Sequence, residues 1–157
     1  DEPLGRIHGL SLPIYEWLRR VAAKAEKRPV VVALHCPQGG GKTTLCESLS
    51  ALFADDGQEC VVMSIDDFYL PHADLVAQTN PLLRGRGLPG THDVHLMAHT
   101  LDALVAGGDG PLGIPRYDKS AHGGRGDRRP RDDWPTVVPA DVDVVVLEGW
   151  CLGFRPL

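Results

Sequence analysis

The sequence lacks a long apolar run, a basic excess and paired cysteines. No stretch approaches the length of a membrane span. The 157 residues carry a formal net charge of −5, whereas nucleic-acid-binding surfaces are usually basic. The four cysteines include no Cys-x-x-Cys pair, which excludes the common zinc motifs and favours reduced thiols. We therefore expect neither a nucleic acid nor a membrane as partner.

The chain also lacks an initial methionine, an internal repeat and a recognisable targeting segment. Its length suits one domain with a sizeable core. Its 43% of hydrophobic and 24% of charged residues are ordinary for a globular protein. We expect a single domain over residues 1–157 that is part of a longer protein, soluble and intracellular.

Three apolar runs predict the strands of a parallel α/β sheet covered on both faces: 30–35, 60–65 and 141–147. Amphipathic periodicity predicts helices from Ser11, as N-cap, to the residue before Pro29, then over 43–54 and 94–106. The first helix is expected to bury one stripe of side chains: Ile14, Trp17, Leu18, Val21, Ala22 and Ala25. Glycine and proline crowd into two regions expected to be loops rather than core elements, 81–90 and 107–139.

The stretch from Val30 to Thr44 reads as a strand, a glycine-rich turn and a helix start. Glycines let backbone N–H groups turn inward on a polyphosphate, and the helix adds its positive end. Lys42 adds a charge near the β- and γ-phosphates, and the Thr43 hydroxyl is placed to bind Mg²⁺. This pattern predicts a phosphate-binding loop made of Pro37, Gln38, Gly39, Gly40, Gly41, Lys42, Thr43 and Thr44. The alternative is a glycine-rich turn without a ligand, and Cys36 stands where the usual pattern has glycine.

Acidic residues follow the second and third predicted strands. Asp66 and Asp67 come directly after the second, and Glu148 follows the third. In open parallel sheets, ligand sites lie at the carboxyl ends of strands, so we expect at least one of the paired acids to act on the γ-phosphate or its acceptor. Glu148 is expected to help hold Mg²⁺. The alternatives are capping acids and an exposed strand-end glutamate. Both strands are expected to flank the strand of the phosphate loop.

Two loops carry arginines that their turns do not need. The first holds Arg84, Arg86, His92 and Asp93, of which Asp93 is expected to cap the following helix. The second runs from residue 116 to residue 131 and contains five arginines. Arginine suits bidentate binding of carboxylate or phosphate, although a charged run of this kind is also typical of a solvated flexible loop.

Five motifs taken together resemble the plant and fungal D-glycerate 3-kinases, within the phosphoribulokinase/uridine kinase group of P-loop kinases. They are PQGGGKTT, SIDDFYL, RGLPGTHD, PRYDKSAHGGRGDR and VVVLEGWCLGFRPL. The resemblance covers about residues 10–157. It implies a P-loop NTPase three-layer α/β fold with a parallel sheet. It also implies ATP- and Mg²⁺-dependent phosphorylation of D-glycerate to 3-phosphoglycerate.

The resemblance also implies roles for single residues. Asp66 would be the general base, Lys42 would act on the transferred phosphoryl group, and Thr43 and Glu148 would serve Mg²⁺. The acceptor would be bound by Asp67, Tyr69, Arg86, His92, Asp93, Arg116 and Tyr117. Arg86 or Arg116 is expected to face the carboxylate of the acceptor, and the sequence does not choose between them.

The resemblance leaves other functions open. Because the family is similar to longer enzymes, we expect this chain to be the N-terminal portion of a kinase. The alternatives are a related kinase for uridine or pantothenate and a non-catalytic ATP-binding fragment. A photosynthetic source would imply the chloroplast stroma and the photorespiratory cycle, and a fungal source would imply the cytoplasm.

Overall fold

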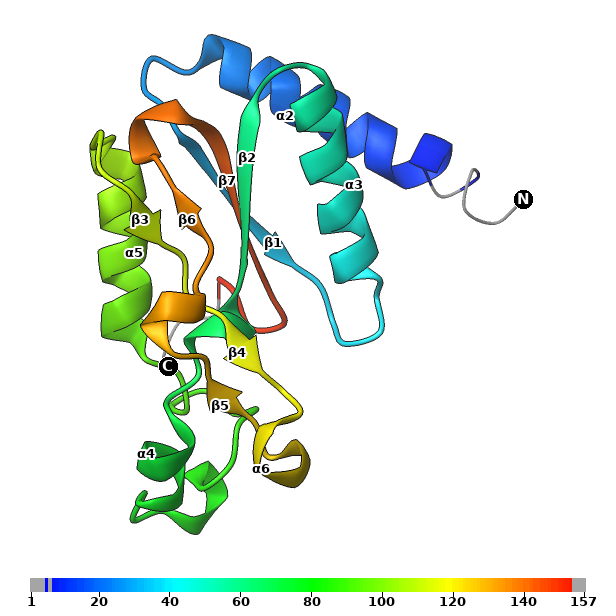
Figure 1. The fold of residues 1–157 in the computed structure, drawn as a ribbon. Helices are drawn as coiled ribbons and strands as arrows, with labels where there is room; N and C mark the ends of the chain where they lie inside the picture. The colour runs from blue at the N-terminus through cyan, green and yellow to red at the C-terminus, as the bar shows by residue number, and fades with distance from the viewer. Residues whose placement is uncertain (1–4, 6, 154–157) are drawn as a thin grey trace. The chain divides into compact units, whose positions relative to one another are not determined.

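The computed structural model describes residue 5 and residues 7–153, which divide into two compact units (Figure 1). The first unit comprises the chain up to Val62 and again from Asp141, and the second is Met63–Ala140. The last four residues of the final motif, 154–157, lie outside the described part, as do residues 1–4 and 6.

The first unit contains a three-stranded sheet in the order β1-β7-β2. β1 (Val30–His35) pairs in parallel with β7 (Val142–Gly149), and β2 (Glu59–Ser64) follows on the far side of β7. The three arrows in Figure 1 run in the same direction. The predicted α/β class with a parallel sheet is confirmed.

The prediction that two strands flank β1 is wrong, because only β7 is its neighbour in the described sheet. Burial explains the order. Val144, Val145 and Val146 are at most 1% exposed, as expected for a central strand. Side chains along β1 alternate instead between half-buried and exposed, and Val31 is 44% exposed. The expectation that β1 is covered on both faces is therefore also wrong.

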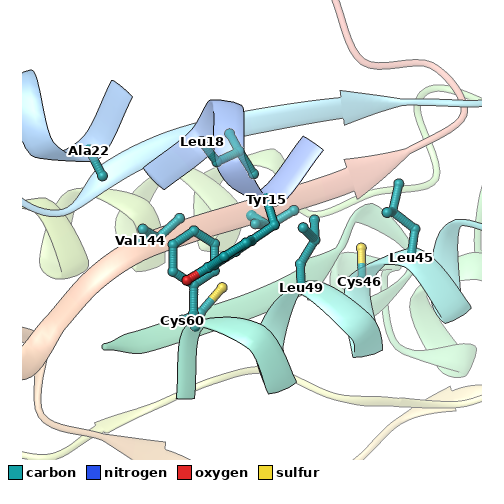
Figure 2. Packing of buried hydrophobic residues seen from close by; sticks show 10 residues of the cluster. Tyr15, Leu18, Ala22, Leu45, Cys46, Leu49, Cys60 and Val144 are labelled. Atoms are coloured by element: carbon teal, nitrogen blue, oxygen red, sulfur yellow. The ribbon is translucent and has the colours of Figure 1, made fainter. Parts of the chain in front are cut away.

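Two helices cover one face of this sheet (Figure 2). They are α2 (Leu12–Lys24) and α3 (Lys42–Asp55), and α3 ends where Gly57, at φ +72°, lets the chain turn. The ring of Tyr15 packs edge-on against Phe53, with centroids 5.0 Å apart. The buried cluster consists of Tyr15, Leu18, Ala22, Leu45, Cys46, Leu49, Phe53, Cys60, Val144 and Val146.

The expected start and buried stripe of the first helix need correction. A π-helical turn, η1 (Ile7–Ser11), runs directly into α2, so Ser11 is buried and makes no side-chain cap. Trp17 is 58% exposed, whereas Tyr15 is buried. Positions 15, 18 and 22 form one narrow stripe at helical spacing, and residue 17 lies about 100° away from residue 18.

The second unit is built from short elements and one long helix, α5 (Val94–Ala106). Asp93 caps α5 as predicted, because its Oδ1 accepts a hydrogen bond from the Leu96 N–H at 2.9 Å, and Gly107 ends the helix at φ +69°. The shorter helical elements are η2 (Ile65–Phe68), α4 (His72–Val76), η3 (Pro81–Leu83), α6 (Ala121–Gly124), η4 (Arg131–Asp133) and η5 (Pro139–Asp141).

The glycine-rich region after α5 is more ordered than the sequence predicts. It forms two antiparallel ladders, β3 (Leu112–Gly113) with β6 (Thr136–Val137) and β4 (Tyr117–Asp118) with β5 (Asp127–Arg128). Its buried side chains include Ile114, Tyr117 and Trp134. The Trp134 indole N–H donates to the Arg129 carbonyl at 2.9 Å. The expectation that this region holds no core elements is therefore wrong.

No helix in the described residues has both the length and the apolar character needed to cross a bilayer.

Candidate active site

The loop between β1 and α3 has the backbone of a phosphate cradle. Gly39 and Gly41 have φ angles of +74° and +78°, a region that side-chain-bearing residues rarely adopt. α3 begins at Lys42, directly after Gly41, so the N–H groups of its first turn face the loop. The Lys42 ammonium donates to the Pro37 carbonyl at 3.1 Å, so the loop is closed by its own lysine.

Cys36 fits this loop because Gly40 has no side chain. A Cβ at residue 40 would lie 2.3 Å from the Cys36 Sγ and 3.1 Å from the Pro37 carbonyl oxygen. The Cys36 N–H donates to the Gly149 carbonyl at 3.2 Å, which extends the β1–β7 ladder up to the loop. The thiol therefore occupies the space beside the loop, and Gly40 is required as its neighbour.

Glu148 offers an oxygen that suits a magnesium ion. It pairs with Leu34 in the β1–β7 register, and its Oε2 is buried without a hydrogen-bond partner among the described residues. Carboxylate and hydroxyl oxygens are ligands that Mg²⁺ accepts, and the ion usually keeps several waters and phosphate oxygens. The side chains of Thr43 and Glu148 therefore fit the predicted ion. The described residues contain no group of three or more metal-binding side chains.

The thiols of two buried cysteines of this unit, Cys46 and Cys60, are unreactive at neutral pH. Burial, followed by the charge of Glu148, raises the pKa of Cys46 to about 11. Burial, followed by Cys46 and Glu59, raises the pKa of Cys60 to about 12. Both thiols therefore stay protonated at neutral pH, and neither is a nucleophile in the folded chain.

The paired acids of the second unit differ in what they contact. The Asp67 Oδ2 accepts hydrogen bonds from the Ser64 N–H at 3.1 Å and from Arg116 Nη1 at 3.3 Å. Burial raises the pKa of Asp67, although the Ser64 N–H and the Arg116 charge oppose the rise. The Asp66 Oδ2 accepts instead from the Lys119 ammonium at 2.7 Å. Asp67 therefore serves as a helix cap, which is the alternative that the sequence left open. Of the two acids, Asp66 is the better candidate for a catalytic role.

Three rings stand beside these acids. Tyr69 and His92 form an isolated antiparallel bridge and stack with centroids 4.3 Å apart, and Tyr117 meets Tyr69 edge-on at 5.3 Å. Burial lowers the pKa of His92, although the charge of Asp66 opposes the shift. The His92 Nε2 is buried without a hydrogen-bond partner in the described part of the chain. A neutral imidazole with an unused nitrogen suits a hydroxylated ligand.

Both carboxylate oxygens of Asp93 accept hydrogen bonds from the protein. Its Oδ1 caps α5, and its Oδ2 accepts from Arg128 Nη1 at 3.1 Å. Arg128 Nη2 also donates to the Tyr69 carbonyl at 2.7 Å. These contacts give Asp93 a structural task in addition to the predicted substrate contact, which stays a prediction.

Arg86 occupies a space that depends on Gly126. A Cβ at residue 126 would lie 2.2 Å from Arg86 Nη1 and 3.0 Å from the Tyr117 hydroxyl. Arg86 Nη1 also donates to the Lys119 carbonyl at 3.0 Å. Burial raises the pKa of Tyr117, and the Arg86 charge opposes the rise. Arg86, from the loop before α5, therefore lies against both Tyr117 of β4 and Lys119, which directly follows β4.

Within the second unit, the structure brings the predicted acceptor residues into one connected network. Lys119 and Gly126 belong to it although the sequence gave them no role, and Arg128, one of the five arginines of the second loop, belongs to it through Asp93 and Tyr69. Lys119 carried no usable signal in the sequence, because its partner Asp66 lies 53 residues earlier. Gly126 and Arg128 had none, since their partners Arg86 and Asp93 are distant in the sequence.

Comparisons with known proteins agree with the motifs. No family model matches the chain. An uncharacterized kinase of Schizosaccharomyces pombe is 42% identical, over 85% of this chain and 50% of its own length. The chloroplastic D-glycerate 3-kinase of Arabidopsis thaliana is 36% identical, over 97% of this chain and 36% of its own length. The chain thus spans half, or less, of the length of these two relatives.

A solved structure gives the same result. The D-glycerate 3-kinase of Cryptococcus neoformans superposes with a TM-score of 0.77 and 35% sequence identity, over 96% of this chain and 54% of that one. The resemblance inferred from the motifs is therefore confirmed at the level of sequence and of fold. The chain is a homologue of the plant and fungal D-glycerate 3-kinases, within the P-loop kinases.

Proposed function

We propose that this chain carries the phosphate-binding and acceptor-binding residues of an ATP-dependent kinase that phosphorylates D-glycerate to 3-phosphoglycerate. The observation that carries the kinase assignment is the loop between β1 and α3. Its left-handed glycines, the free N–H groups at the start of α3 and Lys42 are what a polyphosphate requires. The acceptor assignment is supported by the homologous D-glycerate 3-kinases.

The loop residues bind and orient the donor. The N–H groups of the loop and of the first helical turn hold the phosphate oxygens of ATP, and the Lys42 ammonium leaves Pro37 to neutralise charge on the transferred group. When bound, Mg²⁺ neutralises charge on the β- and γ-phosphates. Thr43 and the buried Oε2 of Glu148 are the side-chain oxygens that would hold the ion.

Asp66 acts on the acceptor. It accepts the proton of the attacking hydroxyl while that oxygen bonds to the γ-phosphorus and ADP leaves. Asp66 suits this task because its carboxylate accepts a hydrogen bond from a lysine that is 60% exposed, whereas Asp67 is held by a main-chain N–H and by Arg116. His92, Tyr69 and Tyr117 would surround the acceptor. In a photosynthetic organism the reaction would serve photorespiration in the chloroplast, and in a fungus it would occur in the cytoplasm.

An acceptor panel tests the proposal on the full gene product. ADP release is measured with D-glycerate, uridine and pantothenate, and D-glycerate is expected to give the highest kcat/KM. Equal or better turnover of uridine or pantothenate would refute the acceptor assignment. ATP binding without turnover of any acceptor would favour a non-catalytic nucleotide-binding protein.

Two substitutions test the residue roles in the same assay. Asp66→Asn is expected to lower kcat by about 10²- to 10⁴-fold, the usual contribution of a general base, while the Kd for ATP stays unchanged. Lys42→Ala is expected to abolish ATP binding measured by calorimetry. Asp74→Asn, which alters an exposed acid of α4, is the matched control. Normal turnover in Asp66→Asn would contradict the base assignment.

A further inference from the structure

A pocket in the second unit is lined by positive side chains. It has a volume of about 400 Å³, and its lining residues come from α4, the loop after η3 and the end of α6. Its charged and apolar lining consists of His72, Leu75, Arg84, Arg86 and Arg125. Three guanidinium groups in one pocket of this size point to an anionic ligand, because arginine binds carboxylates through two parallel N–H···O bonds.

These three arginines are not neutralised by the protein. Arg84 Nε donates to the Gln78 carbonyl at 2.9 Å, and Arg86 Nη1 donates to the Lys119 carbonyl at 3.0 Å. Among the residues that the structure describes, none of the three makes an ion pair with a carboxylate. Arg86 is half-buried, and Arg84 and Arg125 are exposed, so three positive charges gather around one pocket. Their summed field favours a ligand that carries negative charge.

The two other arginines of the network behave differently. Arg116 is paired with Asp67 at 3.3 Å, and Arg128 is paired with Asp93 at 3.1 Å. The positive charges of Arg116 and Arg128 are therefore balanced by these two carboxylates. This contrast separates Arg86 from Arg116, which the sequence left as equal candidates for the carboxylate of the acceptor.

Asp127, the acid beside the pocket, has its own partners. Its Oδ1 accepts from the N–H groups of His72 and Arg128, each at 2.8 Å, and its Oδ2 contacts His122 Nε2 at 3.0 Å. The His122 ring in turn stacks on His72 at 4.0 Å. Asp127 thus holds the wall of the pocket in place and leaves the three guanidinium groups to a ligand.

We propose that this pocket is the subsite for the carboxylate of the acceptor, held by Arg84, Arg86 and Arg125. The inference rests on the proposed kinase function. Arg86 connects the pocket to the base, because it contacts Lys119, whose ammonium binds Asp66. An acceptor without an anionic group leaves three cations unpaired, so the pocket selects carboxylated acceptors over nucleosides.

Calorimetric titration tests the subsite apart from turnover. The full gene product is titrated with D-glycerate, with glycerol as the uncharged analogue of the same carbon chain, and with inorganic phosphate. We expect D-glycerate to bind and glycerol to show no measurable binding. Arg84→Gln and Arg125→Gln should each weaken D-glycerate about 10- to 100-fold, the usual value of a charge-assisted hydrogen bond. Arg129→Gln, an exposed arginine outside the pocket, should leave the Kd within about twofold of the parent.

ADP release by the same variants separates the two hypotheses. Arginine-dependent binding of D-glycerate without its phosphorylation supports the subsite and refutes the proposed function. Phosphorylation of D-glycerate with an unchanged KM in both pocket variants supports the function and overturns the subsite. Absence of D-glycerate binding refutes both. Phosphate binding that depends on Arg125, with D-glycerate binding that does not, assigns the pocket to phosphate and overturns the carboxylate proposal. Both arginines are exposed, so melting curves are expected to match the parent protein.

Discussion

The ammonium group of Lys119 lies 2.7 Å from the Oδ2 of Asp66, the acid to which we assign the base role. The Lys119 side chain is 60% exposed, and an exposed ion pair of this kind stabilises a fold by less than about 1 kcal/mol. The contact therefore matters for the position of the carboxylate rather than for folding. We therefore expect Lys119 to act as a positioning residue for the Asp66 carboxylate.

Lys119→Met tests this positioning. We expect kcat to fall about tenfold because the carboxylate loses its fixed orientation, while the KM for ATP stays the same. The free energy of unfolding should change by less than about 1 kcal/mol. Lys119→Arg keeps the cation and should restore part of the lost kcat. An unchanged kcat in Lys119→Met would show that the ion pair has no part in the reaction.

Gly40→Ala tests the packing of the phosphate loop. The new Cβ would lie 2.3 Å from the Cys36 Sγ, so we expect the loop to distort and ATP binding to weaken by about 1–3 kcal/mol. Cys36→Gly removes the obstructing sulfur. The double variant Cys36→Gly with Gly40→Ala should therefore recover much of the ATP affinity, measured by calorimetry as a double-mutant cycle. Strictly additive effects would show that the two positions do not interact.

Phe53→Ala and Trp17→Ala compare a buried and an exposed aromatic residue of the first unit. Phe53 is 0% exposed, so its truncation should lower the free energy of unfolding by about 3–5 kcal/mol. Trp17 is 58% exposed, and its truncation should cost less than about 1 kcal/mol. The free energies of unfolding are measured by urea unfolding, and the m-values of both variants are expected to equal that of the parent. If Trp17→Ala lowered the free energy of unfolding more than Phe53→Ala does, the result would support the buried stripe with Trp17 that was expected from the sequence.

Cys60 should make stability fall in alkaline solution. The thiol pKa is about 12 in the folded chain and 9.0 in a model thiol. Between these values the unfolded state releases a proton that the folded state retains, so the free energy of unfolding decreases as pH rises above about 9. The limiting slope is about 1.4 kcal/mol per pH unit. Urea unfolding from pH 7 to pH 10.5 should give a shallower decline in Cys60→Ala than in the parent, and an identical decline would contradict the raised pKa.

The features that the sequence predicted well are those encoded by neighbouring residues. The strand, glycine turn and helix start around residues 30–44 depend on that run of sequence, and the cap of α5 depends on Asp93 and the helical stripe that follows. Phosphate binding by this loop stays a prediction. The strand runs were also found close to their expected bounds, because apolar length and β-branching are local properties. The predicted role of Asp66 as base stays a prediction that the kinetic experiments address.

The features that the sequence missed depend on contacts between distant residues. The position of β7 between β1 and β2 is decided by which strand buries both faces, and all three runs look equally apolar. Lys119 meets Asp66 across 53 residues, and Arg128 meets Asp93 across 35. Tyr15 is buried and Trp17 is exposed, and the ring of Tyr15 packs against Phe53, which is distant in the sequence. A short window of sequence therefore cannot predict the strand order, these ion pairs or the burial of Tyr15.

The carboxylate of Asp93 joins the first turn of α5 to β5, and Arg128 extends the link to the main chain of Tyr69. Separation of the Asp93–Arg128 pair breaks the link between the start of α5 and the other two segments. In hydrogen exchange, the amides of Leu96 and of its neighbours in that turn should therefore become protected and exposed together with those of β4 and β5, as one cooperative unit. The loops that carry the acceptor residues would then lose their order in a single step, at a free energy below that of global unfolding.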